Sequence, residues 1–281
     1  MKKDSGIFFI LPALALLALV TLFPVLSVVY LSLQRRLPIF HISRFAGLDN
    51  YLFLLGDDRF WNALGNTLYF TLLSVSLELL LGFAIALLLE RPFRLKGVVR
   101  AAVLIPWAIP TVVSARMWEW ILNTDFGILN YLIGRRINWL GSPFWAMHAA
   151  IMVDVWKSAP FVAILLMAGL SAIPRDLYQA ARVDGAGSWT IFLKITLPLL
   201  RPVIMVVLIF RTLDAFRVFD VIYVLTGGGP ANTTETLSIY AYRVLFQTLQ
   251  FGYGSALAVA VFICTGLISA GYVRLLAGGR P

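Results

Sequence analysis

Charged residues are scarce in this chain of 281 residues. Only 13% of the residues are charged and 60% are hydrophobic, whereas soluble domains contain roughly 25% charged and about 45–50% apolar residues. The composition therefore disfavours a water-soluble fold. The net charge of +9 does not indicate nucleic-acid binding, because the basic residues are scattered between apolar runs and a nucleic-acid site needs them on one face.

Groups that perform chemistry are also few. The single cysteine, Cys264, lies in the apolar run 256–268, so neither an intrachain disulfide nor a cysteine metal cluster can form. His41 and His148 are isolated and lack metal-ligand spacing. The sequence has no glycine-rich phosphate loop and no nucleophile constellation. We therefore expect a protein that is not an enzyme, binds no cofactor itself and does not hydrolyse ATP alone.

Long apolar runs are what the sequence does contain. A helix crosses a bilayer in about 20 residues, and the runs that reach this length are 7–33, 67–89, 98–122, 144–170, 202–225 and 253–276. Helices satisfy their own backbone groups in hydrocarbon, whereas open sheet edges do not. The sequence thus predicts an all-α integral membrane protein of about six transmembrane helices, in a single domain, 1–281.

Two features modify the individual spans. The first run is longer than the core of a signal peptide, so we expect it to remain as a span. Pro12 and Pro24 in the first run, and Pro106 and Pro110 in the third, remove intrahelical hydrogen bonds and predict kinks or broken turns.

The distribution of lysine and arginine predicts the orientation, because cytoplasmic loops carry an excess of both. With the N-terminus inside, the cytoplasmic segments hold Lys2, Lys3, Arg91, Arg94, Lys96, Arg100, Arg175, Arg182, Lys194, Arg201, Arg274 and Arg280. The opposite side holds Arg35, Arg36, Arg44, Arg59, Arg135, Arg136 and Arg243. Both termini and the loop 175–201 are therefore expected in the cytoplasm.

The segment 174–198 predicts a helix, a tight turn and a second helix. Pro174 suits the first helical turn, Gly185 suits the stop, and Ser188 is a candidate cap for the second helix. Within the first helix a stripe of small and flat side chains recurs at three- and four-residue spacing: Leu177, Ala180, Ala181 and Asp184. Such a helix could lie in the groove of another protein or pack on its own bundle, and the residues alone leave both open.

The spacing in this segment resembles the cytoplasmic coupling loop of ABC importer permeases, whose pattern is Glu-Ala-Ala, three residues, Gly, nine residues, Ile, one residue, Leu-Pro. Only Gln179 departs from it, since a neutral amide stands in the glutamate position. The resemblance implies contact with a partner ATPase through Gln179, Ala180, Ala181, Asp184, Gly185, Ile195, Leu197 and Pro198.

A second stretch resembles the outer loop of carbohydrate permeases. It comprises the run Thr226-Gly-Gly-Gly-Pro230 and then Thr234, Thr236, Leu237, Tyr240, Tyr242 and Phe246. The likeness extends over nearly the whole chain, to the maltose-type first permease subunit, and 210–220 looks most like the trehalose-import branch. It implies an inner-membrane sugar importer with a second permease subunit, two ATPase copies that bind ATP and Mg, and an extracytoplasmic solute-binding protein.

Charges inside the predicted spans require partners or water. Arg211, Asp214, Arg217 and Asp220 recur every three residues in the run 202–225, where they could form a self-neutralised ladder along one helix. Alternatively, Asp214, Arg217 and Asp220 line a substrate path, with Phe216 or Phe219 offering an aromatic face to a sugar. Both interpretations remain open.

Two further charged positions raise the same question. In the fourth run we favour an ion pair between Asp154 and Lys157 over a substrate contact by Asp154, and in the second we expect Glu78 to pair across helices. The alternative function is a secondary transporter driven by an ion gradient, which often shows inverted repeats; we find no convincing repeat.

Overall fold

A computed structural model describes residues 5–90 and 94–277. Lys2, Lys3, Arg91 and Arg280, four of the residues used to predict orientation, lie outside the described residues. The chain forms two compact units, unit 1 of Met1–Trp61 with Leu237–Cys264 and unit 2 of Asn62–Thr236 with Thr265–Pro281.

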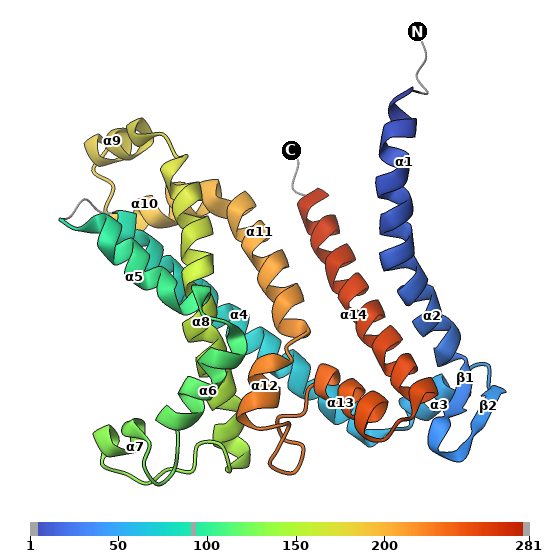
Figure 1. The fold of residues 1–281 in the computed structure, drawn as a ribbon. Helices are drawn as coiled ribbons and strands as arrows, with labels where there is room; N and C mark the ends of the chain where they lie inside the picture. The colour runs from blue at the N-terminus through green and yellow to red at the C-terminus, as the bar shows by residue number, and fades with distance from the viewer. Residues whose placement is uncertain (1–4, 91–93, 278–281) are drawn as a thin grey trace. The chain divides into compact units, whose positions relative to one another are not determined.

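Unit 1 joins an N-terminal helical span to a small hairpin and to three C-terminal helical segments (Figure 1). Its elements are α1 (Ser5–Leu17), the π-helical turn η1 (Ala18–Leu22), α2 (Phe23–Ser32), β1 (Gln34–Leu37), the 3-10 turn η2 (Pro38–Phe40), β2 (Ile42–Phe45), α3 (Asp49–Leu55), α13 (Leu237–Tyr242), the π-helical η4 (Arg243–Gln247) and the first part of α14 (Phe251–Ala277). Helix α14 continues into unit 2. The π-helical turn η1 ends just before Pro24, which has no N–H for the helical ladder.

Hydrogen bonds from α3 hold the C-terminal end of the first span, at the end of α2. Asn50 donates its side-chain amide to the backbone carbonyls of Ser32 and Gln34 at 2.7 and 2.9 Å. The hydroxyls of Tyr51 and Ser32 lie 2.6 Å apart. The amide and hydroxyl of α3 thus satisfy polar groups where the helix of the first span ends.

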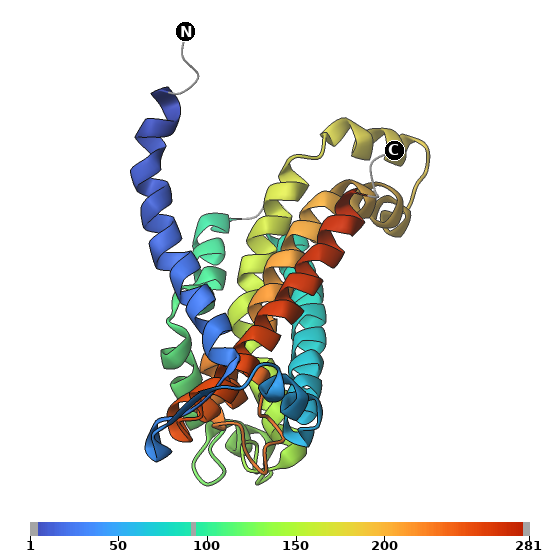
Figure 2. The ribbon, with the colours of Figure 1, turned by 90° about the vertical axis from the view of Figure 1, so that its right-hand side faces the viewer.

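Unit 2 is a helical bundle with a protruding hairpin at one end. Its elements are the greater part of α4 (Asp58–Glu90), α5 (Lys96–Ala108), α6 (Thr111–Ile121), α7 (Ile128–Ile133), α8 (Pro143–Ser171), α9 (Arg175–Val183), α10 (Ser188–Ile191), the π-helical η3 (Phe192–Thr196), α11 (Leu197–Phe216) and α12 (Asp220–Leu225). Within this unit, α9 and α10 lie at one end and α6, α7 and α12 at the other (Figures 1 and 2).

The core of unit 2 lies where α4, α8 and α11 meet. Its buried apolar residues are Ala86, Val162, Ala163, Leu166, Leu170, Ile173, Leu200 and Val207. Glycine permits the close approach, because a Cβ at Gly82 would lie 2.5 Å from Cγ1 of Val162 and one at Gly169 would lie 2.7 Å from Cδ2 of Leu200. Small residues at such crossings bring membrane helices into van der Waals contact.

The helical class and most of the spans agree with the sequence. Among the described residues, five helices are long and apolar enough to cross a membrane, or six when α5 and α6 count as one bent span. The broken turn predicted near Pro110 is confirmed, since α5 and α6 meet at 93° there, while Pro106 lies inside α5.

The boundaries of the fifth span are wrong in the sequence prediction. We expected one helix over 202–225, but the helix runs from Ser188 to Phe216 and the separate helix α12 begins at Asp220. No proline or glycine marks this break in the sequence, so composition could not locate it. The predicted ladder of four charges along one helix is therefore wrong as well, because Arg217 and Asp220 lie beyond the end of α11.

Candidate functional site

The hairpin of α9 and α10 has the helix, turn and helix that the sequence predicts. Helix α9 ends at Val183, and the amide of Ala186 donates to the carbonyl of Ala181 at 2.9 Å. Gly185 adopts φ of +76°, a left-handed conformation that costs residues with a Cβ about 1–2 kcal/mol. Ser188 does not cap the second helix as expected, because it is the first helical residue and Gly187 holds the cap position without a side-chain bond.

The predicted stripe on α9 is divided between two directions. Ala181 is buried against its own chain, and Tyr178 packs beside it on the core of unit 2, with its hydroxyl 3.2 Å from that of Thr196. Leu177 of the stripe is exposed, and so are the predicted coupling residues Gln179, Ala180, Asp184 and Gly185. One side of this helix therefore packs on its own bundle and the other faces outward; docking of the exposed side on a partner stays a prediction.

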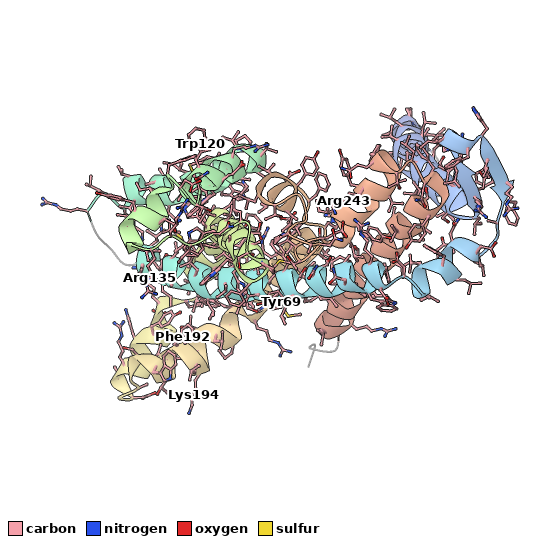
Figure 3. The ribbon with its side chains drawn as sticks, turned by 90° about the horizontal axis from the view of Figure 1, so that it is seen from below. Tyr69, Trp120, Arg135, Phe192, Lys194 and Arg243 are labelled. Carbon is pink, nitrogen blue, oxygen red and sulfur yellow. The ribbon has the colours of Figure 1, made fainter. Side chains whose placement is uncertain are left out.

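The second limb of the hairpin adds apolar surface that sequence reasoning missed. Trp189 is 72% exposed and stacks on Phe192 at 5.6 Å, and Val183 on the other limb is 87% exposed. Phe192 and Lys194 mark the limb that extends away from the bundle (Figure 3). Of the motif residues on this limb, Ile195 is half-buried whereas Leu197 and Pro198 are exposed. Large apolar side chains on both limbs of a protruding hairpin are typical of an interaction surface.

Four charged side chains from three helices meet inside unit 2. Arg211 of α11 donates from Nε to Oε2 of Glu78 at 2.6 Å and from Nη2 to Oε1 of the same residue at 2.8 Å. It also donates to Asp214 at 2.5 Å and to Asp154 of α8 at 3.3 Å. Glu78, on α4, is wholly buried. The expected pairing of Glu78 across helices is thus confirmed, and Arg211 holds three helices together.

The expected ion pair between Asp154 and Lys157 is not what the structure contains. Asp154 accepts from Arg211, while Nζ of Lys157 donates to the backbone carbonyls of Trp107 and Ile109 at 3.2 and 2.7 Å. Those carbonyls lie at the end of α5, where the break before Thr111 deprives them of helical partners. A lysine at a helix C-terminus also meets the negative end of the helix dipole.

A polar cavity of about 180 Å³ lies beside this cluster. It is lined at the break between α5 and α6 and at the break between α11 and α12. Its lining is mostly polar and includes Thr111, Asp154, Lys157, Ser158, Asp214, Arg217, Phe219 and Asp220. Five of the predicted path residues, Asp154, Asp214, Arg217, Phe219 and Asp220, are therefore brought together around one space. Phe216 does not join them, because its side chain is 1% exposed in the interior.

Two of the lining residues are held by the break after α11. The guanidinium of Arg217 donates from Nε to the carbonyl of Leu213 at 3.1 Å. The ring of Phe219 stacks on that of Tyr223 with 5.1 Å between their centroids. The chain leaves the helical conformation at Arg217 and resumes it at Asp220. Because of this break Phe219 lines the cavity, whereas Phe216 on the preceding helix is buried in the core.

The sequence matches the family model of the binding-protein-dependent transport system inner membrane component over residues 78–278. The chain belongs to this family. It is a permease, a transport component of the inner membrane and not an enzyme, and the alternative of a secondary transporter is rejected.

Several relatives of this permease match nearly its full length. It is 44% identical to the trehalose/maltose transport system permease protein MalF of Thermococcus litoralis, over 93% of this chain and 90% of that protein. It is 41% identical to the trehalose transport system permease protein SugA of Mycobacterium tuberculosis, over 100% and 91%. It is also 40% identical to the sulfoquinovosyl glycerol transport system permease protein SmoG of Agrobacterium fabrum, over 94% and 88%.

Solved structures share the fold of the permease. A chain of a bacterial ABC transporter involved in the import of the acidic polysaccharide alginate superposes with a TM-score of 0.86 at 24% identity, covering 99% of this chain and 97% of that one. A chain of the alginate transporter in complex with an alginate pentasaccharide-bound periplasmic protein gives 0.82 at 25% identity, with coverage of 96% and 93%.

The loop 226–236 of the permease, which contains the run Gly-Gly-Gly-Pro, is anchored to α4 and to the break between α11 and α12. Thr234, wholly buried, lies 2.7 Å from the hydroxyl of Thr226 and donates to the carbonyl of Gly229 at 2.7 Å. Asn66 of α4 donates to the carbonyls of Asn232 and Glu235, each at 3.1 Å. In addition, the hydroxyl of Thr236 donates to the carbonyl of Val218, beside the break that follows α11. The loop is therefore hydrogen-bonded to Val218, which lines the cavity.

Proposed function

We propose that this permease forms the translocation path of an ATP-driven sugar importer, and that its cargo is a disaccharide such as trehalose or maltose. The observation that carries the proposal is the polar cavity, which combines carboxylates, an ammonium and a guanidinium with the ring of Phe219. Sugar hydroxyls both donate and accept hydrogen bonds, and a pocket with a few convergent polar groups and an aromatic wall suits them. The names of two relatives, which transport trehalose or trehalose and maltose, support the same cargo.

The charges of the cavity favour a neutral sugar over an anionic one. Its lining holds the carboxylates of Asp154, Asp214 and Asp220 against the cations Lys157 and Arg217. Arg211, which pairs with Asp154 and Asp214 from behind, also pairs with Glu78, so the formal charges of these seven groups sum to −1. An anionic substrate would need an excess of positive charge, as phosphate and carboxylate sites have.

We further propose that the hairpin of α9 and α10 docks on an ATPase partner. The exposed side of α9, together with Val183 and Trp189, provides a small apolar surface that a groove could cover. The importer would contain a second permease subunit, two ATPase copies that bind ATP and Mg, and an extracytoplasmic solute-binding protein. ATP binding would close the ATPase pair, and the hairpin would transmit this motion to the helices around the cavity.

The proposed orientation places both termini and the hairpin in the cytoplasm. Within unit 2, the end that carries α9 is rich in basic residues, namely Arg94, Lys96, Arg100, Arg175, Arg182, Lys194 and Arg201. Basic residues near span ends are retained on the cytoplasmic side. The end that carries α6, α7 and α12 would then receive the sugar from the solute-binding protein.

Uptake by the complete importer in proteoliposomes tests the cargo. ATP-dependent accumulation of labelled trehalose or maltose, with weak accumulation of sulfoquinovosyl glycerol, is the expected result. Sulfoquinovosyl glycerol as the preferred cargo would contradict the charge argument, and accumulation driven by an ion gradient without ATP would contradict the importer.

A further inference from the structure

The segment 34–55 of unit 1 exposes apolar side chains in a pattern opposite to that of a water-facing surface. It contains β1, β2 and α3 and begins two residues after the first span ends at Ser32. The large apolar residues that are between 59% and 73% exposed are Ile39, Phe40, Phe45, Leu48, Leu52, Phe53 and Leu55. An exposed apolar surface of this density indicates contact with a membrane or with another protein.

The two sides of α3 show which way this surface faces. Leu54 is buried and Asn50 binds the C-terminal end of the first span, so this side of α3 is occupied by its own unit. Leu48, Leu52 and Leu55, spaced by four and three residues, occupy the opposite side and are exposed. In an amphipathic helix that meets water, the exposed side is polar. Here it is apolar, as in helices that lie in the bilayer interface.

Three arginines accompany the apolar side chains. Arg35 and Arg44 stand directly opposite each other across the hairpin, an arrangement of like charges that destabilises paired strands unless an anion lies between or beside them. Arg36 follows on β1. Within residues 5–90 and 94–277, no ion pair joins these three arginines to a carboxylate.

A recess beside the hairpin offers room for a headgroup. It measures about 330 Å³, and its polar lining residues are Arg35, Arg36, Asp49, Asn50, Gln250 and Tyr253. Guanidinium groups bind phosphate in a planar, bidentate way. The recess therefore combines two guanidinium groups, one carboxylate and two amides next to an apolar surface. Its net positive charge and apolar surroundings suit the phosphate and the upper acyl chain of a phospholipid.

We propose that the segment 34–55 is an interfacial anchor that binds anionic phospholipid at the membrane surface where the first span ends. Phe40, Phe45 and the leucines of α3 enter the level of the upper acyl chains. The three arginines bind the phosphates of surrounding lipids. A bilayer surface is favoured over a protein as occupant because the segment lies two residues from a membrane span, so its apolar side chains meet the interface without any further component.

Lipid-quenching fluorescence of the complete importer in nanodiscs tests the depth of the anchor. Cys264, the single cysteine, is replaced by serine, and an environment-sensitive fluorophore is attached at Phe40→Cys. The matched controls are Leu19→Cys, exposed in the span, and Arg135→Cys, exposed in a loop of unit 2. Phospholipid brominated near the headgroup is expected to quench the probe at 40 and not the probe at 135, while deep bromination quenches the probe at 19.

The arginines are tested in the same nanodiscs, made of phosphatidylcholine alone or mixed with phosphatidylglycerol. We expect phosphatidylglycerol to increase the quenching at 40, and the triple change Arg35→Gln, Arg36→Gln and Arg44→Gln to remove this increase. Each lost arginine should lower the preference for the anionic lipid roughly fivefold, the factor equivalent to about 1 kcal/mol. The triple change to lysine retains the charge and should keep most of the preference.

Two outcomes would overturn the proposal. A probe at 40 that is reached by aqueous iodide and not by brominated lipid places the segment in water. A probe that is shielded from both, by the solute-binding protein or by the second permease subunit, assigns the surface to a protein partner. Neither outcome depends on which sugar is transported, so the anchor and the proposed cargo can fail separately.

Discussion

Arg211 and Glu78 form a two-pronged contact, with Nε and Nη2 of the arginine donating to the two carboxylate oxygens at 2.6 and 2.8 Å. The side chain of Glu78 is wholly buried and that of Arg211 is 6% exposed. Because α4 and α11 contribute one residue each, this contact fixes the helices on either side of the charge cluster. Removing Arg211 would leave the buried carboxylate of Glu78 without its cationic partner.

The substitution Arg211→Ala should therefore destabilise the permease by about 3–5 kcal/mol. Thermal unfolding of the detergent-solubilised complex measures the loss. The control is Arg116→Gln, which removes the exposed pair of Arg116 with Glu119 and should cost at most about 1 kcal/mol. Equal effects of the two changes would show that the interior pair has no special structural role.

The lysine that closes the break between α5 and α6 gives a second prediction. Lys157→Met removes both hydrogen bonds to the carbonyls of Trp107 and Ile109 and should leave the break mobile. We expect faster hydrogen exchange of the amides around 107–111 and reduced uptake. Lys157→Arg, which keeps a charged donor, should partly restore slow exchange and uptake. Unchanged exchange in the methionine variant would contradict a role of Lys157 in holding the break.

Two glycines in the hairpin provide a matched pair of substitutions. Gly185 has φ of +76°, whereas Gly187 has φ of −70°, and a Cβ at either position would meet no atom within 4 Å. Gly185→Ala should thus strain the turn by about 1–2 kcal/mol and weaken co-purification of the ATPase with the permease. Gly187→Ala should leave association nearly unchanged. If both variants retain the ATPase equally, the shape of the turn does not govern docking.

Asp57 in unit 1 gives a prediction about pH. Burial alone would raise the pKa of Asp57, but hydrogen bonds from the hydroxyls of Tyr240 and Tyr253 and from the amides of Arg59 and Phe60 lower it below its ordinary value of 3.8. A carboxylate with a lowered pKa stabilises the folded state above its unfolded pKa, and this contribution disappears as the pH falls through the folded value. Asp57→Asn should therefore lower the melting temperature at pH 7 and have a smaller effect as the pH falls below 3.8.

Parallel melting curves of the wild type and the Asp57→Asn variant at several pH values measure this difference. Asp58→Asn is the control, because the carboxylate of Asp58, the next residue, is exposed at the start of α4. A gap in melting temperature between wild type and Asp57→Asn that stays constant with pH would exclude Asp57 as the titrating group.

The sequence predicted the features that depend on local spacing. The apolar runs located most spans, Pro110 marked the break after α5, and Gly185 marked the turn of the hairpin. Contacts between distant residues were beyond it: Glu78 and Arg211 are separated by 133 positions, so neither periodicity nor composition could pair them.

Local conformation without a sequence signal also escaped prediction. Helix α11 ends at Phe216 without proline or glycine, and this end decides that Phe219 lines the cavity while Phe216 packs in the core. The hairpin of β1 and β2 in unit 1 turns through His41 at a positive φ of 51°, although the sequence around it contains no asparagine-glycine or aspartate-glycine pair.

The central claim is that the polar cavity carries the sugar, and transport by Asp214→Ala and Arg217→Ala tests it most directly. Uptake of labelled trehalose or maltose and ATP hydrolysis are measured together in proteoliposomes that contain the assembled importer. Both side chains line the cavity, and neither belongs to the hairpin. The expected result is a severe loss of uptake in each variant while the subunits still assemble and hydrolyse ATP. Normal uptake in both variants would contradict the account.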